Sequence, residues 1–220
     1  MTRSLKFGRV GAASGQAKSL VVLLHGYGAD GTDLLGLADP LAPHLPDTVF
    51  IAPDAPDPCA VSGFGRQWFP IPRFDGSSEV DAAVAMNRAA DDLNAFLDQR
   101  LAEEGLTPAA LALVGFSQGA MMSLHVAPRR DEKIAGVVAI SGRLLRPQVL
   151  AQEMKVKPPV VLIHGDQDDV VPFQEMQAAG NALVAAGFET FGHVMQGAGH
   201  GIAPDGLGVA MQFLKERLPG

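Results

Sequence analysis

The feature that most constrains the fold of this chain is the pentapeptide Gly115-Phe-Ser-Gln-Gly119. An apolar run from Leu111 leads into it, and a helix-compatible segment follows it until Pro128. This is a G-x-S-x-G sequence in which a serine stands on a sharp turn between a strand and a helix. The glycines let neighbouring backbone pass close to the turn, and the following helix directs free N–H groups toward it. The motif predicts that Ser117 is a nucleophile; the alternative is a serine with a purely structural role.

Short continuous apolar runs recur along the chain and predict strands that are buried on both faces. They span residues 19–25, 48–52, 111–116, 134–141, 159–164 and 188–195. Helices are expected between them, at about 33–41, 78–104, 118–127, 173–186 and 204–218. This alternation predicts an α/β protein with a mostly parallel central sheet and helices on both faces. Because no repeat or linker-like stretch is present, a single domain over 1–220 is expected.

Residues 54–78 form the longest predicted loop and are rich in Pro, Gly and aromatic residues. A loop of this length in a compact domain usually has a function. Chemistry in a parallel sheet collects at the carboxyl ends of the strands. We therefore expect His25-Gly26 and segments 115–119, 164–172 and 197–201 to meet at one edge.

A serine hydroxyl becomes a good nucleophile only when a base takes its proton and a third group orients that base. Of the six histidines, His200 lies between two glycines in a loop that follows a predicted strand, and it is the expected base. His25 and His164 each end a strand before a glycine and are expected to hold their turns. The orienting acid is expected after His164, where the pattern alone does not separate the aspartates 166, 168 and 169.

Five segments give the sequence a resemblance to a known family. They are Leu24-His-Gly-Tyr-Gly28, Ala52-Pro-Asp-Ala-Pro56, Gly115-Phe-Ser-Gln-Gly119, His164-Gly-Asp-Gln-Asp-Asp-Val-Val-Pro172 and Gly199-His200. In this order they resemble the carboxylesterase/phospholipase family of small α/β-hydrolases, which includes the acyl-protein thioesterases. The resemblance implies an α/β-hydrolase fold and a serine hydrolase that cleaves carboxylic esters through an acyl-enzyme, with thioesters or lysophospholipids as alternative substrates.

The resemblance also implies roles for individual residues. The family's catalytic acid falls on Asp168, and its serine and histidine fall on Ser117 and His200. An oxyanion hole is implied from the backbone N–H groups of Tyr27 and Gln118. Each donor of this kind typically contributes ~10²–10³ in rate.

A substrate pocket is expected among apolar residues near the same edge of the sheet. The candidates are Trp68, Phe69, Ile71, Met121, Leu144 and Leu145. The loop after Pro56 keeps the tryptophan of the thioesterase members, but its surroundings contain additional Pro and Gly. The resemblance therefore transfers no particular acyl substrate to this chain.

Two other functions fit parts of the sequence. Gly26-Tyr-Gly28-Ala-Asp-Gly31 has the G-x-G-x-x-G pattern of a dinucleotide-binding oxidoreductase, although Asp54 comes later than the ~20-residue spacing of that fingerprint. The chain could also be a hydrolase-fold binding protein without activity. A metal-dependent hydrolase is disfavoured by the lack of an H-E-x-x-H pattern. No cofactor or metal ion is expected.

Composition limits the partners. The formal net charge is −7 without a basic cluster, which argues against nucleic acid. No apolar segment suggests a signal peptide or stable membrane insertion, and Cys59 is the only cysteine. We expect a cytoplasmic protein that acts on a small-molecule ester or acyl substrate. The sequence predicts no oligomeric state.

Overall fold

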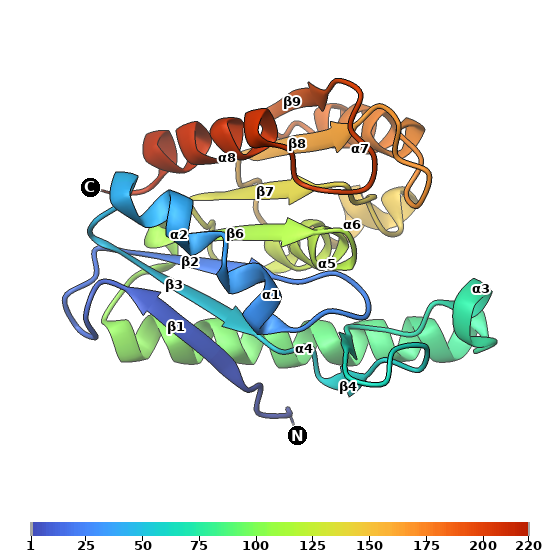
Figure 1. The fold of residues 1–220 in the computed structure, drawn as a ribbon, viewed down its shortest axis with the longest axis horizontal. Coiled ribbons are helices and arrows are strands. Elements are labelled where there is room, and N and C mark those ends of the chain that lie inside the picture. Colours follow the sequence, from blue (N-terminus) through green and yellow to red (C-terminus); the bar gives the residue numbers. More distant parts are fainter. Residues whose placement is uncertain (1, 220) are drawn as a thin grey trace.

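The centre of the molecule, a computed structural model that describes residues 2–219, is a seven-stranded sheet (Figure 1). Its strand order is β1-β3-β2-β6-β7-β8-β9. The strands are β1 (Phe7–Gly11), β2 (Ser19–Leu24), β3 (Thr48–Pro53), β6 (Leu111–Phe116), β7 (Gly136–Ile140), β8 (Val160–Gly165) and β9 (Thr190–Met195). All neighbours are parallel except β1, which pairs antiparallel with β3. The predicted mostly parallel sheet is confirmed.

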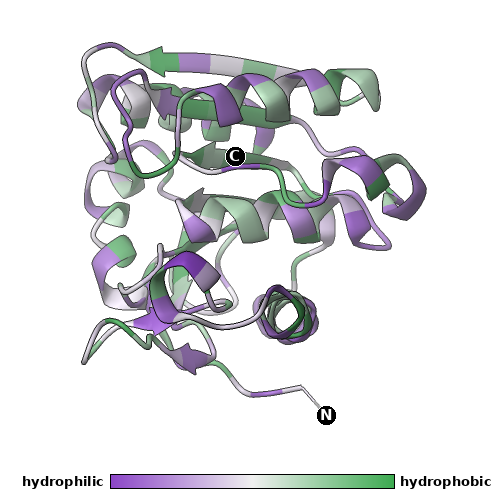
Figure 2. Ribbon diagram, turned by 90° about the vertical axis from the view of Figure 1, so that its right-hand side faces the viewer, coloured by the Kyte–Doolittle hydropathy of each residue, from purple (hydrophilic) through white to green (hydrophobic). Residues whose placement is uncertain are grey.

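Helices cover both faces of the sheet, as predicted. One face carries α1 (Gly31–Leu35), α2 (Ala38–Leu41) and α8 (Pro204–Arg217), and the other carries α4 (Glu79–Glu104), α5 (Gln118–Val126), α6 (Leu150–Glu153) and α7 (Gln174–Ala185). Successive residues of one strand alternate between the two faces. In β2, Leu20 and Val22 belong to the core under α4 and α5, whereas Val21 and Leu23 belong to the core under α1 and α8. Figure 2 shows the helices with hydrophilic and hydrophobic residues interleaved, as expected for elements with one buried side.

Two differences from the prediction lie in the first 41 residues. Strand β1 was not expected, because its residues are half-buried or exposed and form no continuous apolar run. The segment 33–41 contains two short helices instead of one. The Asp30 side chain caps the start of α1. The break between α1 and α2 is explained by Pro40. Pro40 lacks the N–H that would bond to the Gly36 carbonyl in a continuous helix.

Helix α4 follows the prediction closely. The Ser78 hydroxyl accepts a hydrogen bond from the Asp81 N–H at 3.0 Å, and Gly105 ends the helix in the left-handed region with a φ of 69°. The preceding loop is more ordered than predicted. It contains the two-residue strands β4 (Asp57–Pro58) and β5 (Arg66–Gln67), which pair antiparallel, and the short helix α3 (Pro72–Asp75).

No helix within residues 2–219 combines the length and the apolar character needed to cross a lipid bilayer.

Candidate active site

Ser117 lies on the turn between β6 and α5, as the G-x-S-x-G pattern predicted. Its φ of 54° and ψ of −116° are rare for a residue with a side chain, and such strain is typical of functional turns. The flanking glycines permit this turn. A Cβ on Gly115 would overlap the Gly119 carbonyl, and a Cβ on Gly119 would overlap the Leu24 carbonyl at the end of β2.

The structure brings together three side chains from the carboxyl ends of β6, β8 and β9. His200 Nε2 lies 3.0 Å from Ser117 Oγ, and His200 Nδ1 lies 2.8 Å from Asp168 Oδ2. The His200 side chain is 17% exposed, whereas the Asp168 side chain is fully buried. This geometry suits proton transfer from a hydroxyl to an imidazole that a carboxylate orients.

The Asp168 carboxylate receives three hydrogen bonds and has a second imidazole nearby. Oδ1 accepts the N–H groups of Val170 and Val171 at 3.0 and 2.9 Å. Oδ2 lies 2.8 Å from His200 Nδ1 and 3.2 Å from His164 Nε2. Burial alone raises the pKa of this carboxyl, but the bonds from His200 and the two amides outweigh burial and hold the pKa below its ordinary value. Asp168 is therefore ionised at neutral pH.

The two neighbouring aspartates have other surroundings. Asp166 accepts the Gly197 N–H at 2.7 Å, on the loop that carries His200, and Asp169 is exposed. Only Asp168, among the three candidates, contacts the His200 ring in the described structure.

The buried histidines His25 and His164 hold turns, as predicted. His164 Nε2 lies 2.8 Å from the Val171 carbonyl, which only accepts, so this nitrogen carries the proton. His25 has the opposite tautomer. Its Nε2 accepts the Ala55 N–H at 2.9 Å, and its Nδ1–H donates to the Gly26 carbonyl at 2.8 Å. Burial lowers the pKa of His25, which keeps the ring neutral in this role.

Two main-chain donors lie beside the serine. Within residues 2–219, neither the Tyr27 N–H nor the Gln118 N–H donates a hydrogen bond to the protein. The Tyr27 loop directly contacts the turn, because a Cβ on Gly26 would lie 3.3 Å from Ser117 Cβ. The Tyr27 ring packs against Phe74, and burial raises the pKa of its phenol.

A cavity of about 450 Å³ opens next to Ser117 and His200, on the side of the sheet that α1 and α8 cover. Its walls are mainly apolar, and the sequence analysis did not identify them. The lining residues are His25, Gly26, Tyr27, Ala29, Asp33, Leu34, Leu37, Phe116, Ser117, His200, Gly201 and Ile202. Leu34 and Leu37 are one helical turn apart just after the His25 loop, and Ile202 follows His200 by two residues. Their closeness in sequence to His25 and His200 was the signal from which these lining residues could have been predicted.

None of the six predicted pocket residues lines this cavity. Five of them belong to the core on the opposite side of the sheet, under α4 and α5: Trp68, Phe69, Met121, Leu144 and Leu145. Ile71 is half-buried and precedes α3. Trp68 has no exposed surface at all. A contact of these residues with substrate stays a prediction.

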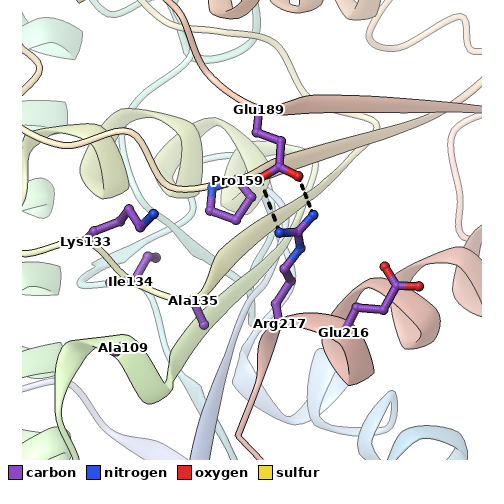
Figure 3. A pocket seen from close by; sticks show the side chains of 8 residues that line it. All are labelled: Ala109, Lys133, Ile134, Ala135, Pro159, Glu189, Glu216 and Arg217. Atoms are coloured by element: carbon purple, nitrogen blue, oxygen red, sulfur yellow. Dashed lines mark hydrogen bonds and ion pairs between the residues drawn. The ribbon is translucent and has the colours of Figure 1, made fainter.

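A second cavity, of about 310 Å³, lies at the other edge of the sheet (Figure 3). Its lining residues precede β6 to β9 or end α8: Ala109, Lys133, Ile134, Ala135, Pro159, Glu189, Glu216 and Arg217. The Arg217 guanidinium is already paired with Glu189 at 2.6 Å. No serine, cysteine or histidine lines it, so this cavity has no hydroxyl or thiol nucleophile and no imidazole base.

The Gly26–Gly31 loop is unsuited to a dinucleotide. The amides that would receive a pyrophosphate are already used, since the Gly28 N–H donates to the Arg66 carbonyl and the Gly31 N–H donates to Asp54. Asp30 accepts two further amides of the same turn. These carboxylates would also repel phosphate. Among residues 2–219, no group of three or more His, Cys, Asp or Glu is arranged to hold a metal ion.

Comparisons with known proteins agree with this geometry. The phospholipase/carboxylesterase family profile matches residues 6–218. Acyl-protein thioesterase 1 of Saccharomyces cerevisiae is 31% identical over 225 residues, which cover 96% of this chain and 97% of the yeast protein. Esterase YpfH of Escherichia coli is 26% identical, over 92% of this chain and 84% of its own. The crystal structure of esterase PE8 is 44% identical, with a TM-score of 0.92 over 98% of this chain and all of its own.

The fold is therefore that of the α/β-hydrolases, as the sequence motifs implied. Since the family match covers nearly the whole chain, this protein belongs to the phospholipase/carboxylesterase family and is a hydrolase of the esterase/thioesterase type.

Proposed function

We propose that the protein is a carboxylesterase in which Ser117, His200 and Asp168 form the catalytic triad. The observation that carries this proposal is the unbroken hydrogen-bonded row from the Ser117 hydroxyl through His200 to Asp168, at 3.0 and 2.8 Å. His200 Nε2 takes the hydroxyl proton while Ser117 attacks the ester carbonyl. The protonated ring then gives that proton to the leaving alcohol, and an acyl-enzyme remains. A water molecule, activated by the same nitrogen, releases the acid.

The Tyr27 and Gln118 N–H groups stabilise the tetrahedral intermediate in this mechanism. Both are unused by the protein in the described part of the chain, and both lie beside Ser117. The peptide unit between Gly26 and Tyr27 is fixed by a hydrogen bond, because the His25 Nδ1–H donates to its carbonyl oxygen. Since C=O and N–H point to opposite sides of a trans peptide, this bond directs the Tyr27 N–H away from His25. A donor fixed before the reaction needs no reorganisation during it.

The substrate is an ester with an apolar acyl or alcohol group. Support comes from the cavity of about 450 Å³ beside Ser117, whose walls include Leu34, Leu37, Phe116 and Ile202. Preference for esters over thioesters is supported by the 44% identity to esterase PE8, against 31% identity to the yeast acyl-protein thioesterase.

The test compares the wild type with Ser117→Ala on p-nitrophenyl acetate, butyrate, octanoate and palmitate, and on the matching thioesters. Wild-type turnover of the esters is expected to exceed that of the thioesters. Ser117→Ala is expected to lower kcat by at least roughly 10⁴, as single triad knockouts do. A fluorophosphonate should label the wild type at Ser117 and leave the variant unlabelled. A variant that retains a tenth of wild-type turnover would end the assignment of the nucleophile.

A further inference from the structure

Residues 65–69, here called the strap, run beside the loop that carries Tyr27. The Gly28 N–H donates to the Arg66 carbonyl at 2.9 Å, and the Arg66 N–H donates to the Ala29 carbonyl at 2.8 Å. The two segments approach so closely that a Cβ on Gly65 would overlap the Gly28 carbonyl. One end of the strap is therefore paired with the loop that supplies the first of the two amide donors.

The other end of the strap is held by the Gln118 side chain. Its Oε1 accepts the Trp68 N–H at 2.8 Å, and its Nε2 donates to the Phe69 carbonyl at 2.7 Å. This side chain is 0% exposed, so both bonds form away from water. The side-chain amide thus holds the main chain of the strap at two points. The main-chain N–H of the same residue is the second amide donor.

Trp68 connects the strap to the base of the Tyr27 loop. Its indole Nε1–H donates to the His25 carbonyl at 3.0 Å, and its ring is 0% exposed. His25 in turn holds the Gly26 carbonyl through Nδ1 at 2.8 Å. A continuous set of buried hydrogen bonds therefore runs from the Gln118 side chain through Trp68 to the peptide whose N–H belongs to Tyr27.

We infer that Trp68 and the Gln118 side chain are positioning residues that set the distance and the direction between the two amide donors. The inference rests on the proposed function, since it assigns a task to parts of that same site. The donors come from loops that are far apart in sequence. An oxyanion hole needs both of them within about 2.7–3.1 Å of one oxygen. Neither Trp68 nor the Gln118 side chain touches the substrate in this role.

The experiment removes these hydrogen bonds with apolar substitutions. Gln118→Met keeps the side-chain volume and loses both bonds to the strap. Trp68→Phe loses the bond to His25 and also leaves a small cavity, because phenylalanine is smaller than tryptophan. Thr48→Val is the matched control. It removes a buried hydrogen bond of 2.7 Å with Ser19, at the opposite end of β2 and β3. Thermal unfolding midpoints of the three variants show how far each substitution weakens the fold.

Steady-state kinetics on p-nitrophenyl butyrate should separate positioning from folding. We expect kcat to fall about 10- to 100-fold in Gln118→Met and about 3- to 10-fold in Trp68→Phe, with KM within about twofold of the wild type. Thr48→Val should keep the wild-type kcat. A trifluoromethyl ketone, which forms an oxyanion when the Ser117 hydroxyl adds to it, should lose affinity by the same factor by which kcat/KM falls.

The outcomes are distinguishable from a failure of the proposed function. If Ser117→Ala abolishes turnover while Gln118→Met and Trp68→Phe keep kcat within twofold, the strap has no positioning role and the triad stands. If Ser117→Ala is active, the proposed function itself fails. A fall in kcat without a matching loss of ketone affinity also overturns the positioning role. If Gln118→Met does not fold, Trp68→Phe decides by the same criteria.

Discussion

Replacement of Asp168 by asparagine tests the proposed mechanism most sharply. The carboxylate accepts from two amides at Oδ1 and lies beside two imidazoles at Oδ2. Asparagine offers one oxygen and one NH₂ group in their place. With its NH₂ toward these amides, the buried Val171 N–H and the part-buried Val170 N–H would lose their acceptor, at a cost of about 1–3 kcal/mol for the buried group. The opposite orientation is therefore favoured, with the oxygen on the amides and the NH₂ toward the imidazoles.

That orientation reverses the His200 tautomer. An NH₂ group facing Nδ1 makes this nitrogen an acceptor and moves the ring proton to Nε2, where it faces the Ser117 hydroxyl. The ring can then no longer take the serine proton. His164 cannot adapt in the same way, because its Nε2–H is held by the Val171 carbonyl at 2.8 Å. We therefore expect a folded variant that is about 1–3 kcal/mol less stable, with kcat lower by roughly 10⁴, as for the same change in other triads.

The assay compares Asp168→Asn with Asp166→Asn and Asp169→Asn, in hydrolysis of p-nitrophenyl butyrate and in urea unfolding. The two controls remove carboxylates from the same loop that do not contact His200 in the described structure. They should keep at least about a third of wild-type kcat. A folded Asp168→Asn protein with more than a hundredth of wild-type kcat would refute the tautomer argument. If Asp169→Asn lowered kcat as much as Asp168→Asn, the assignment of Asp168 as the acid that orients His200 would fail.

Three further predictions concern stability and specificity. Burial, with Arg129 nearby, lowers the pKa of His125 to about 4. Between about pH 6.5 and pH 4 only the unfolded chain binds a proton at this ring, so the folded protein loses stability as the pH falls through this range. His125→Leu should lose about 2 kcal/mol less than the wild type between pH 7 and 5 in urea unfolding, and equal losses would contradict this. Gly119→Ala should cost roughly 3 kcal/mol or more, because its Cβ would overlap the Leu24 carbonyl; a wild-type unfolding midpoint would contradict the packing. Leu37→Trp narrows the cavity and should lower kcat/KM for the octanoate about tenfold relative to the acetate; an unchanged ratio would place the acyl chain elsewhere.

The positions of the candidate catalytic groups could be predicted because topology dictates them. Buried parallel strands appear in the sequence as apolar runs, and their carboxyl ends share one edge. This was enough to expect Ser117, His200 and the acidic loop to meet. Choosing Asp168 among three aspartates needed the family resemblance, since all three lie within four residues. Its distinguishing feature is the pair of amides from Val170 and Val171, which depends on the folded turn.

Other features could not be predicted for physical reasons. Strand β1 pairs at an edge with few buried residues, so it has no apolar pattern to recognise. The cavity is lined from α1, from the turn after His200 and from the end of β6, and only folding shows which side chains remain beside an opening. Trp68 is the clearest example of a residue whose place in the structure could not be predicted from the sequence. An aromatic residue in a long loop suggests a binding surface, yet the ring is fully buried and its N–H bonds to His25.

The contacts of the strap also bear on how far its sequence can change. Gln118 binds the main-chain N–H of Trp68 and the main-chain carbonyl of Phe69, not their side chains. The pairing with Gly28 and Ala29 likewise involves only the main chain of Arg66. Such bonds tolerate many side chains, provided that the path of the backbone is kept. The close approach at Gly65 and the indole bond of Trp68 are the points where residue type matters. A loop with additional Pro and Gly can therefore still hold the two amide donors, while its outer surface is free to suit a different substrate.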